Sequence, residues 1–151
     1  MTPLEILRTY RIFAVVGLSS RPERPSFSVA SYLRERGYRI VPVNPLLDEV
    51  LGERCYPDLP SVPFPIEVVD IFRRSELVGP VVEDAIRIGA KVVWMQLGIR
   101  NEEAAKTARA AGLAVVQDRC MKIEYGRLSG ELAWSGVNSG LISSRRRRPL
   151  A

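Results

Sequence analysis

Three segments of this chain repeat one pattern, in which an amphipathic helical stretch is followed by a glycine and then by a short apolar run. The helical stretches cover residues 29–36, 81–88 and 102–111, the glycines are Gly37, Gly89 and Gly112, and the apolar runs cover 38–43, 90–95 and 113–116. Many helices end at a residue with a left-handed backbone conformation, which glycine adopts without strain. The runs are too short for helices and are apolar nearly throughout, as parallel strands covered on both faces are. Strands that alternate with helices in this way predict a parallel α/β sheet.

Two further apolar runs, residues 12–16 and 66–72, bring the predicted sheet to five strands. Right-handed crossovers then give a doubly wound α/β fold with helices on both faces. Numbered along the chain, the five strands are expected in the order 3-2-1-4-5. A short helix is expected over residues 3–9. Prolines are frequent in residues 44–65, so we expect mostly loop there, with one helical turn around residues 46–51.

The charge of the chain is concentrated at its end. The formal net charge is +5, and Arg145 to Arg148 contribute four of these charges, so the rest of the chain is nearly neutral. We expect one domain over residues 1–139 and a basic, disordered tail over 140–151. A nucleic-acid-binding domain would spread its basic residues over a folded face, so no specific nucleic acid partner is expected.

The remaining composition excludes several classes of protein. No apolar run approaches the roughly 20 residues of a membrane-spanning helix, so no membrane association is expected. The two cysteines, Cys55 and Cys120, do not form a disulfide framework, and a cytoplasmic location is expected. The chain contains no histidine, which removes histidine-based catalytic triads and histidine metal sites. No metal site and no catalytic residue are expected.

The loop after the first predicted strand is the strongest candidate for a binding site. It runs from a buried strand through Gly17 into a polar segment with two arginines, Arg21 and Arg24, and then into a predicted helix. Backbone amides and the positive end of a helix dipole would meet there, which favours phosphate. The candidate ligand residues in this segment are Gly17, Ser19, Ser20, Arg24, Pro25, Ser26 and Ser28. The simpler alternatives are that Gly17 serves only a tight turn, that Ser26 or Ser28 caps the helix, and that the arginines are surface charges.

The other predicted strands also end in residues suited to ligands. In doubly wound sheets the ligand lies beyond the carboxyl ends of the strands where the strand order reverses, here expected between strands 1 and 4. The candidates are Asn44 and Pro45 after strand 2, Phe72 and Arg73 after strand 3, and Gln96, Leu97, Gly98 and Ile99 after strand 4. Asn44 and Pro45 are equally typical of a plain turn, and Phe72 could be the last core residue of its strand.

Two common nucleotide motifs are absent from the sequence. Gly17 is not followed by the further glycines of a dinucleotide fingerprint, and Asn44 stands where an acidic residue would bind a ribose. The glycine-rich loop of nucleoside triphosphatases is also absent. The long and basic loop favours a ligand with more phosphate charge at one end.

Taken together, five segments of the chain resemble one family. They are residues 15–26, 37–45, 69–74, 92–99 and 118–124. In these segments the chain resembles the small, free-standing CoA-binding domain proteins of bacteria and archaea, which are related to the CoA-binding domain of the succinyl-CoA synthetase alpha subunit. The resemblance implies a Rossmann-like fold that binds coenzyme A or an acyl-CoA and has no reaction of its own.

The resemblance also implies a role for each part of the site. The first loop would hold the CoA pyrophosphate, through Gly17, Ser19, Ser20, Arg24 and the amides near Ser26. Asn44, Pro45, Phe72 and Arg73 would border the adenosine 3′-phosphate, and residues 96–99 match a CoA-contacting loop of the synthetase. The catalytic phosphohistidine of the synthetase belongs to a second domain, and the chain has Tyr125 where the family motif often has histidine.

Cys120 is a separate candidate. It follows the fifth predicted strand, near the expected end of the pantetheine arm, and Arg119 and Lys122 nearby would favour its thiolate. A mixed disulfide between Cys120 and CoA is therefore a hypothesis, although a lone cysteine is more often a small buried apolar residue. The alternative functions are an NAD(P)-binding redox protein, an acyl-CoA ligase-like component and a regulatory protein with a vestigial pocket. A homodimer is a further open alternative.

Overall fold

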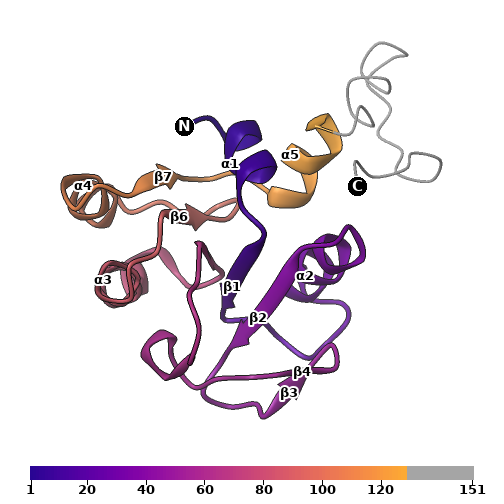
Figure 1. Cartoon of the computed structure of the whole chain (residues 1–151). Coiled ribbons are helices and arrows are strands. Elements are labelled where there is room, and N and C mark those ends of the chain that lie inside the picture. The colour runs from indigo at the N-terminus through magenta and orange to yellow at the C-terminus, as the bar shows by residue number, and fades with distance from the viewer. Residues whose placement is uncertain (129–151) are drawn as a thin grey trace.

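The computed structural model describes residues 1–128 of the 151-residue chain (Figure 1). The predicted basic tail, and the last part of the predicted domain, therefore lie outside the described residues. The elements in chain order are α1 (Pro3–Thr9), β1 (Ile12–Val16), α2 (Pro25–Glu35), β2 (Arg39–Val43), β3 (Glu49–Val50), β4 (Glu53–Arg54), η1 (Leu59–Ser61), β5 (Val68–Ile71), η2 (Ser75–Leu77), α3 (Val78–Arg87), β6 (Val92–Met95), α4 (Glu102–Ala110), β7 (Ala114–Val116) and α5 (Met121–Leu128).

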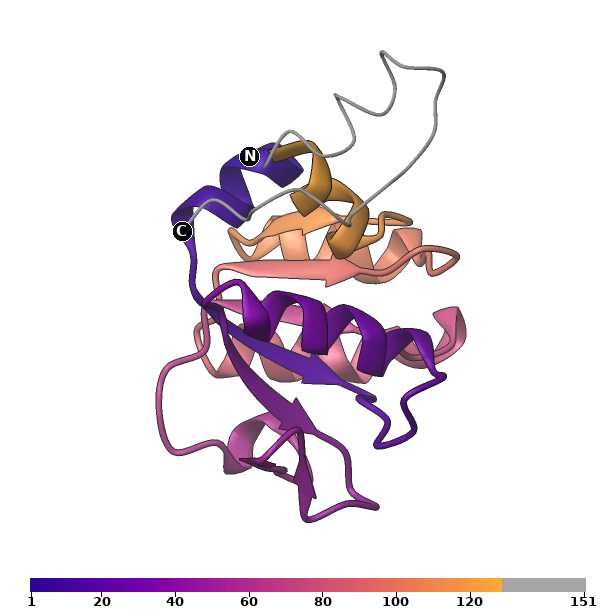
Figure 2. The ribbon, with the colours of Figure 1, turned by 90° about the vertical axis from the view of Figure 1, so that its right-hand side faces the viewer.

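Five parallel strands form the main sheet, in the order β2-β1-β5-β6-β7. Helices cover both faces: α3 and α4 lie on one side of the sheet, and α1, α2 and α5 lie on the other (Figure 1). Figure 2, turned by 90°, shows α2 lying across the face that it shares with α5. The predicted Rossmann-like α/β class, with a five-stranded parallel sheet, is therefore confirmed.

The core consists of two apolar clusters, one on each face of the sheet. Phe13, Val15 and Trp94 point to the side of α1, α2 and α5, whereas Ala14 and Val93 point to the side of α3 and α4. Neighbouring strand residues point to opposite faces, and the strands β1, β5 and β6 are buried almost throughout. This double burial explains why the strand sequences are continuously apolar.

The strand order differs from the expected 3-2-1-4-5. In the same numbering the main-sheet strands lie in the order 2-1-3-4-5, because the third strand, β5, pairs with β1 and not with β2. Pro42 explains why β2 lies at the edge: proline has no amide hydrogen for a strand ladder. Val43 accepts from Gly17 on the β1 side, and the carbonyl of Pro42 accepts from the Tyr56 amide at the opposite edge.

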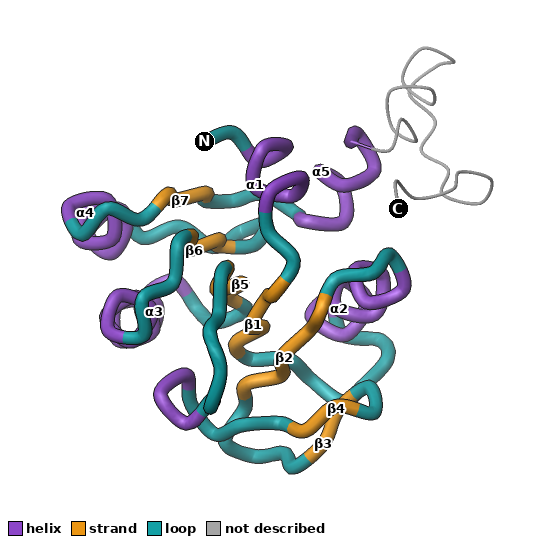
Figure 3. The backbone as a smooth tube through the Cα atoms, in the orientation of Figure 1, coloured by secondary structure: helices purple, strands orange, loops and turns teal. Residues whose placement is uncertain are grey.

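The connection between β2 and β5 also differs from the expectation. Residues 46–51 do not form a helical turn. The chain instead forms a two-residue antiparallel pair, β3 with β4, around a turn in which both Leu51 and Gly52 have positive φ (Figure 3). Two consecutive residues of this kind are typical of a tight hairpin turn, and the Leu51–Gly52 pair was the sequence signal for it.

Candidate functional site: a basic cleft between β1 and β5

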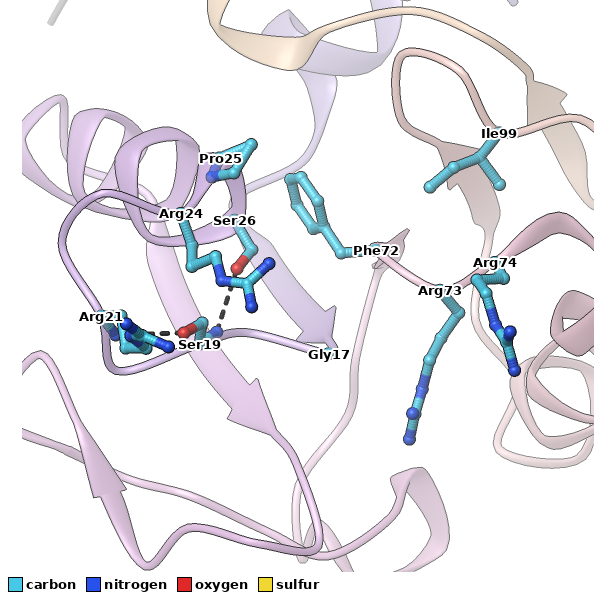
Figure 4. A pocket seen from close by; sticks show the side chains of 10 residues that line it. All are labelled: Gly17, Ser19, Arg21, Arg24, Pro25, Ser26, Phe72, Arg73, Arg74 and Ile99. Atoms are coloured by element: carbon cyan, nitrogen blue, oxygen red, sulfur yellow. Dashed lines mark hydrogen bonds between the residues drawn. The ribbon is translucent and has the colours of Figure 1, made fainter.

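A cleft of about 480 Å³ lies beyond the carboxyl ends of β1 and β5. Its lining residues are Gly17, Ser19, Arg21, Arg24, Pro25, Ser26, Phe72, Arg73, Arg74 and Ile99 (Figure 4). The chain leaves β1 toward β2 through α2 and leaves β5 toward β6 through α3, on opposite faces of the sheet. The cleft therefore occupies the switch point of the doubly wound sheet, which lies between strands 1 and 3 and not between strands 1 and 4 as expected.

Gly17 allows the two walls of the cleft to meet. Its φ is +88°, and a Cβ atom at this position would lie 2.3 Å from the carbonyl oxygen of Phe72. The Gly17 amide donates to Val43, and the Phe72 amide donates to Val16, each at 2.9 Å. Glycine is therefore required at position 17 by the close approach of two strand ends as well as by a turn.

The loop after Gly17 is held by its own serines. The hydroxyl of Ser26 accepts from the Ser19 amide, and the hydroxyl of Ser19 accepts from the Arg21 amide, both at 3.0 Å. Helix α2 begins at Pro25 with Arg24 as its N-cap, and no side chain among residues 1–128 caps it. The expectation that Ser26 or Ser28 caps this helix is wrong, because the Ser26 hydroxyl is used by the loop and Ser28 lies four positions past the N-cap residue, Arg24. The positive end of the α2 dipole therefore opens onto the cleft.

Two of the four arginines that line the cleft have a neighbouring carboxylate. Arg21 forms an ion pair with Glu23 at 2.9 Å, and Arg74 lies 3.7 Å from Glu76. Arg24 and Arg73 form no ion pair with any described residue. Figure 4 shows them on opposite sides of the cleft, with Phe72 between them. Two guanidinium groups without a carboxylate partner in the described part of the chain give the site a positive charge, which suits a multiply phosphorylated ligand.

Several predicted site residues thus lie together on this cleft: Gly17, Ser19, Arg24, Pro25, Ser26, Phe72, Arg73 and Ile99. Arg74 and Arg21 also line it, although neither was among the predicted ligand residues. Arg74 directly follows the predicted Arg73, and Arg21 stands in the predicted loop, so their positions in the sequence were sufficient signals.

The other predicted site residues do not line this cleft. Asn44 donates to the carbonyl of Leu18 at 3.0 Å and accepts from the Leu46 amide, so it fastens the turn after β2 to the loop after β1. Pro45 and Ser20 are exposed outside the cleft. Ser28 lines a smaller hollow between α2 and α5, where Lys122 approaches its hydroxyl at 3.5 Å.

The four residues after β6, Gln96 to Ile99, do not all reach the main cleft. Ile99 reaches the main cleft. Gln96 is buried and bonded inside the fold, and Gly98 donates to Asp118 at 2.7 Å. Leu97 lines a second cleft of about 300 Å³, together with Asp118, Arg119, Cys120, Ile123, Glu124 and Arg127. Cys120 and Leu97 therefore belong to one cleft, and Lys122 extends away from it over the Tyr32 ring.

Asp70 is a buried polar residue that sequence reasoning did not single out. It lies in the middle of β5, it has no exposed surface, and its Oδ1 accepts from Gln96 Nε2 at 2.6 Å. Burial raises the pKa of Asp70 to about 8, although the Gln96 hydrogen bond acts in the opposite direction. The signal was a single acidic residue within an otherwise apolar strand.

A cleft with this charge at the switch point of a doubly wound sheet is the feature by which such folds bind phosphorylated nucleotides. Comparison with known proteins gives the family. The family model described as CoA binding domain matches residues 11–126, and this chain belongs to that family. The resemblance drawn from the sequence motifs is therefore confirmed.

Individual relatives are consistent with this assignment. The YneT protein of Bacillus subtilis, described as uncharacterized, is 41% identical over 121 residues, which cover 80% of this chain and 90% of YneT. A solved structure of a hypothetical protein from Pyrococcus horikoshii is 47% identical with a TM-score of 0.81, and the match covers 85% of this chain and 92% of that one.

A third relative is much longer. An ADP-forming acetate–CoA ligase of Archaeoglobus fulgidus is 29% identical over 97 residues, which cover 63% of this chain but only 14% of the ligase. This chain is thus similar to one small part of that enzyme. Among residues 1–128, no helix has the length and apolar character needed to cross a lipid bilayer.

Proposed function

We propose that this protein binds coenzyme A, or an acyl-CoA, in the cleft between β1 and β5, and that it does so as a cytoplasmic binding protein without a reaction of its own. The observation that carries the proposal is that Arg24 and Arg73, which have no ion-pair partner within residues 1–128, line one cleft in a chain of the CoA binding domain family. The cleft volume of about 480 Å³ lies within the usual range of small-molecule sites.

The pyrophosphate of CoA is assigned to the Arg24 side of the cleft. Arg24 is the N-cap of α2, so its guanidinium and the uncapped first turn of the helix act on the same anion. The Ser26 hydroxyl, which accepts from the Ser19 amide, keeps the loop open around that position. The Gly17 and Ser19 amides already donate to Val43 and Ser26, so we expect the amide contacts to the pyrophosphate to come from the first turn of α2, near Ser26.

The 3′-phosphate of the adenosine is assigned to the Arg73 side. Arg73 follows β5 on the opposite wall, and the half-buried Phe72 ring lies between it and Arg24 (Figure 4). An aromatic ring beside a phosphate contact is suited to the adenosine, because bases stack on aromatic faces. This arrangement separates the two phosphate groups of CoA on two walls of the cleft.

A non-catalytic role fits the chemistry of the chain. The sequence contains no histidine, so the phosphohistidine chemistry of acyl-CoA ligases has no residue to carry it. The match to only 14% of the A. fulgidus ligase points the same way, because the chain corresponds to one part of a larger enzyme. The competing functions, NAD(P) binding and a ligase-like component, remain outcomes of the test below.

The test measures which ligands stabilise the protein, and its central comparison is between CoA and dephospho-CoA, which lacks the 3′-phosphate. Thermal shift with CoA, acetyl-CoA, dephospho-CoA, NAD, NADP and ATP should show stabilisation by CoA, about 2.7 kcal/mol at one hundred times its dissociation constant. Arg24→Ala should weaken CoA and dephospho-CoA alike, by about 1.5–3 kcal/mol, or roughly 10- to 150-fold. Arg73→Ala should weaken CoA by a similar amount and leave dephospho-CoA nearly unchanged.

Arg74→Ala is the matched control, because Arg74 lines the same cleft but is near Glu76. It should have the smallest effect of the three substitutions. Thermal stabilisation by NAD or NADP but not by CoA would favour a redox protein. No stabilisation by any of these ligands would favour a regulatory protein with a vestigial pocket. If Arg24→Ala binds CoA as the wild type does, the phosphate assignment is wrong even where CoA is the ligand.

A further inference from the structure

The buried pair Asp70 and Gln96 lies between the ligand cleft and helix α5. Asp70 is the third residue of β5, two positions before Phe72, which lines the cleft. Gln96 directly follows β6 and is 2% exposed. The pair thus links the two strand ends from which one wall of the cleft extends.

Gln96 makes hydrogen bonds in both directions. Its Nε2 donates to Asp70 Oδ1 at 2.6 Å, and its Oε1 accepts from the amide of Met121, the first residue of α5, at 3.3 Å. Its own carbonyl accepts from the Ile99 amide at 2.9 Å, which closes the turn that brings Ile99 to the cleft. One side chain therefore connects the start of α5, the cleft wall and the centre of the sheet.

Asp70 determines which way the Gln96 amide points. A glutamine amide has a donor end and an acceptor end of nearly equal size, so an acceptor on one side fixes its orientation. Asp70 Oδ1 is that acceptor, and it leaves Gln96 Oε1 facing the Met121 amide. The second oxygen of Asp70, Oδ2, is buried and has no hydrogen-bond partner among the described residues.

We propose that the Asp70–Gln96 pair is a positioning element that couples the ligand cleft to the docking of helix α5. When the pair is intact, the 96–99 turn and the first turn of α5 are held together. When the pair is broken, α5 loosens at its start, and Ile99 no longer holds its place in the cleft wall. The ligand part of this inference rests on the proposed CoA binding, whereas the coupling to α5 does not.

The surroundings of Asp70 make the pair sensitive to pH. The apolar cluster on its face of the sheet, from β1, β6, α2 and α5, includes tyrosines, and the partly buried Cys120 packs against it. Three cations on this side, Arg11, Arg36 and Lys122, lie over the rings of Tyr38 and Tyr32. The carboxylate on α5, Glu124, is bonded to Arg127. Burial raises the pKa of Asp70 to about 8, so alkaline pH places an unbalanced charge in this pair.

The experiment measures amide hydrogen exchange of α5 without ligand, as protection factors corrected for the intrinsic rate. Gln96→Met should lower the protection of the first turn of α5 by about tenfold, because the loss of one buried hydrogen bond corresponds to about that factor. Asp70→Leu should lower it as well, whereas Asp70→Asn, which keeps an acceptor oxygen, should preserve it. Wild-type protection should fall as the pH rises toward about 8 and level off above it, and the Asp70→Asn variant should not show this fall.

Gln117→Met is the matched control. Gln117 Oε1 accepts from the Asn101 amide at 2.8 Å, so it makes the same kind of bond at the start of α4 and not of α5. Its substitution should leave α5 protection unchanged. Equal loss of α5 protection in Gln117→Met and Gln96→Met, or wild-type protection in Asp70→Leu, would overturn the coupling.

The ligand arm uses CoA as the probe. Asp70→Leu should weaken CoA binding several-fold, with Asp70→Asn close to the wild type. A wild-type protein that does not bind CoA would contradict the proposed function alone, since the exchange measurements are made without ligand. If CoA binds and Asp70→Leu binds it with wild-type affinity, α5 docking and the cleft are not coupled.

Discussion

The substitution Gly17→Ala tests the close approach between β1 and β5. A Cβ atom at position 17 would lie 2.3 Å from the Phe72 carbonyl oxygen, and real Cβ contacts do not fall below 3.0 Å. The two strand ends would therefore have to separate. That movement weakens the Phe72–Val16 and Gly17–Val43 hydrogen bonds, at a cost of about 1 kcal/mol for each bond.

The same substitution also forces alanine into a left-handed conformation, which costs roughly 1–2 kcal/mol. Gly37→Ala isolates this second contribution, because Gly37 has a φ of +96° and an added Cβ there meets no atom within 4 Å. We expect Gly17→Ala to lower the free energy of unfolding by about 3–4 kcal/mol, and Gly37→Ala by about 1–2 kcal/mol.

Urea unfolding of the two variants measures the difference directly. Thermal unfolding provides a second measurement, since each kcal/mol corresponds to about 2–4 °C in Tm for a chain of this size. A difference of about 2 kcal/mol between the variants would support the close approach as the main requirement for glycine. Equal losses of stability in the two variants would refute this reasoning, and Gly17 would then serve only as a turn residue.

Three further predictions concern Asp70, Cys120 and Asn101. Asp70→Asn should gain stability over the wild type as the pH rises from about 4 to about 8, because the folded protein binds the Asp70 proton more tightly than the unfolded chain does. The difference in the free energy of unfolding should grow by at most about 1.4 kcal/mol per pH unit. A difference in urea unfolding that does not depend on pH would contradict this prediction. Mild diamide, which takes up the two thiol hydrogens, should join CoA to Cys120 as a mixed disulfide visible by intact mass; the same adduct on Cys120→Ser, or none on the wild type, would disprove this reaction. Asn101→Ala should lower stability by about 1 kcal/mol in the same assay, because Asn101 Oδ1 caps α4 by accepting from the Ala104 amide at 2.9 Å; a stability equal to the wild type would show that this cap contributes little.

Local sequence patterns predicted most of the fold. The repeated helix–glycine–strand units predicted the parallel sheet and its helices, because periodicity and glycine act over a few neighbouring residues. Strand order depends on pairing between distant segments, and it was wrong. Pro42 contained the missing information, since a proline in β2 is compatible with an edge strand and not with a central one.

The residues of the candidate site that directly follow a strand could be predicted from the sequence. The rule that ligands lie beyond the carboxyl ends of parallel strands brought Gly17, Phe72 and Arg73 to one cleft. The same rule could not tell which polar residues are used inside the fold. Asn44 and Gln96 follow their strands as expected, but both are bonded to backbone groups of neighbouring loops and helices. Such bonds depend on three-dimensional packing that sequence spacing does not give.

The outer side of β2 has a consequence for how the chain meets other chains. Open strand edges tend to recruit strands from neighbouring molecules, and native proteins block them. Here Pro42 offers no donor, and Tyr56 already occupies the adjacent backbone groups through its bridge to Val43. Pairing of a further strand is therefore hindered at the Pro42 end of this edge.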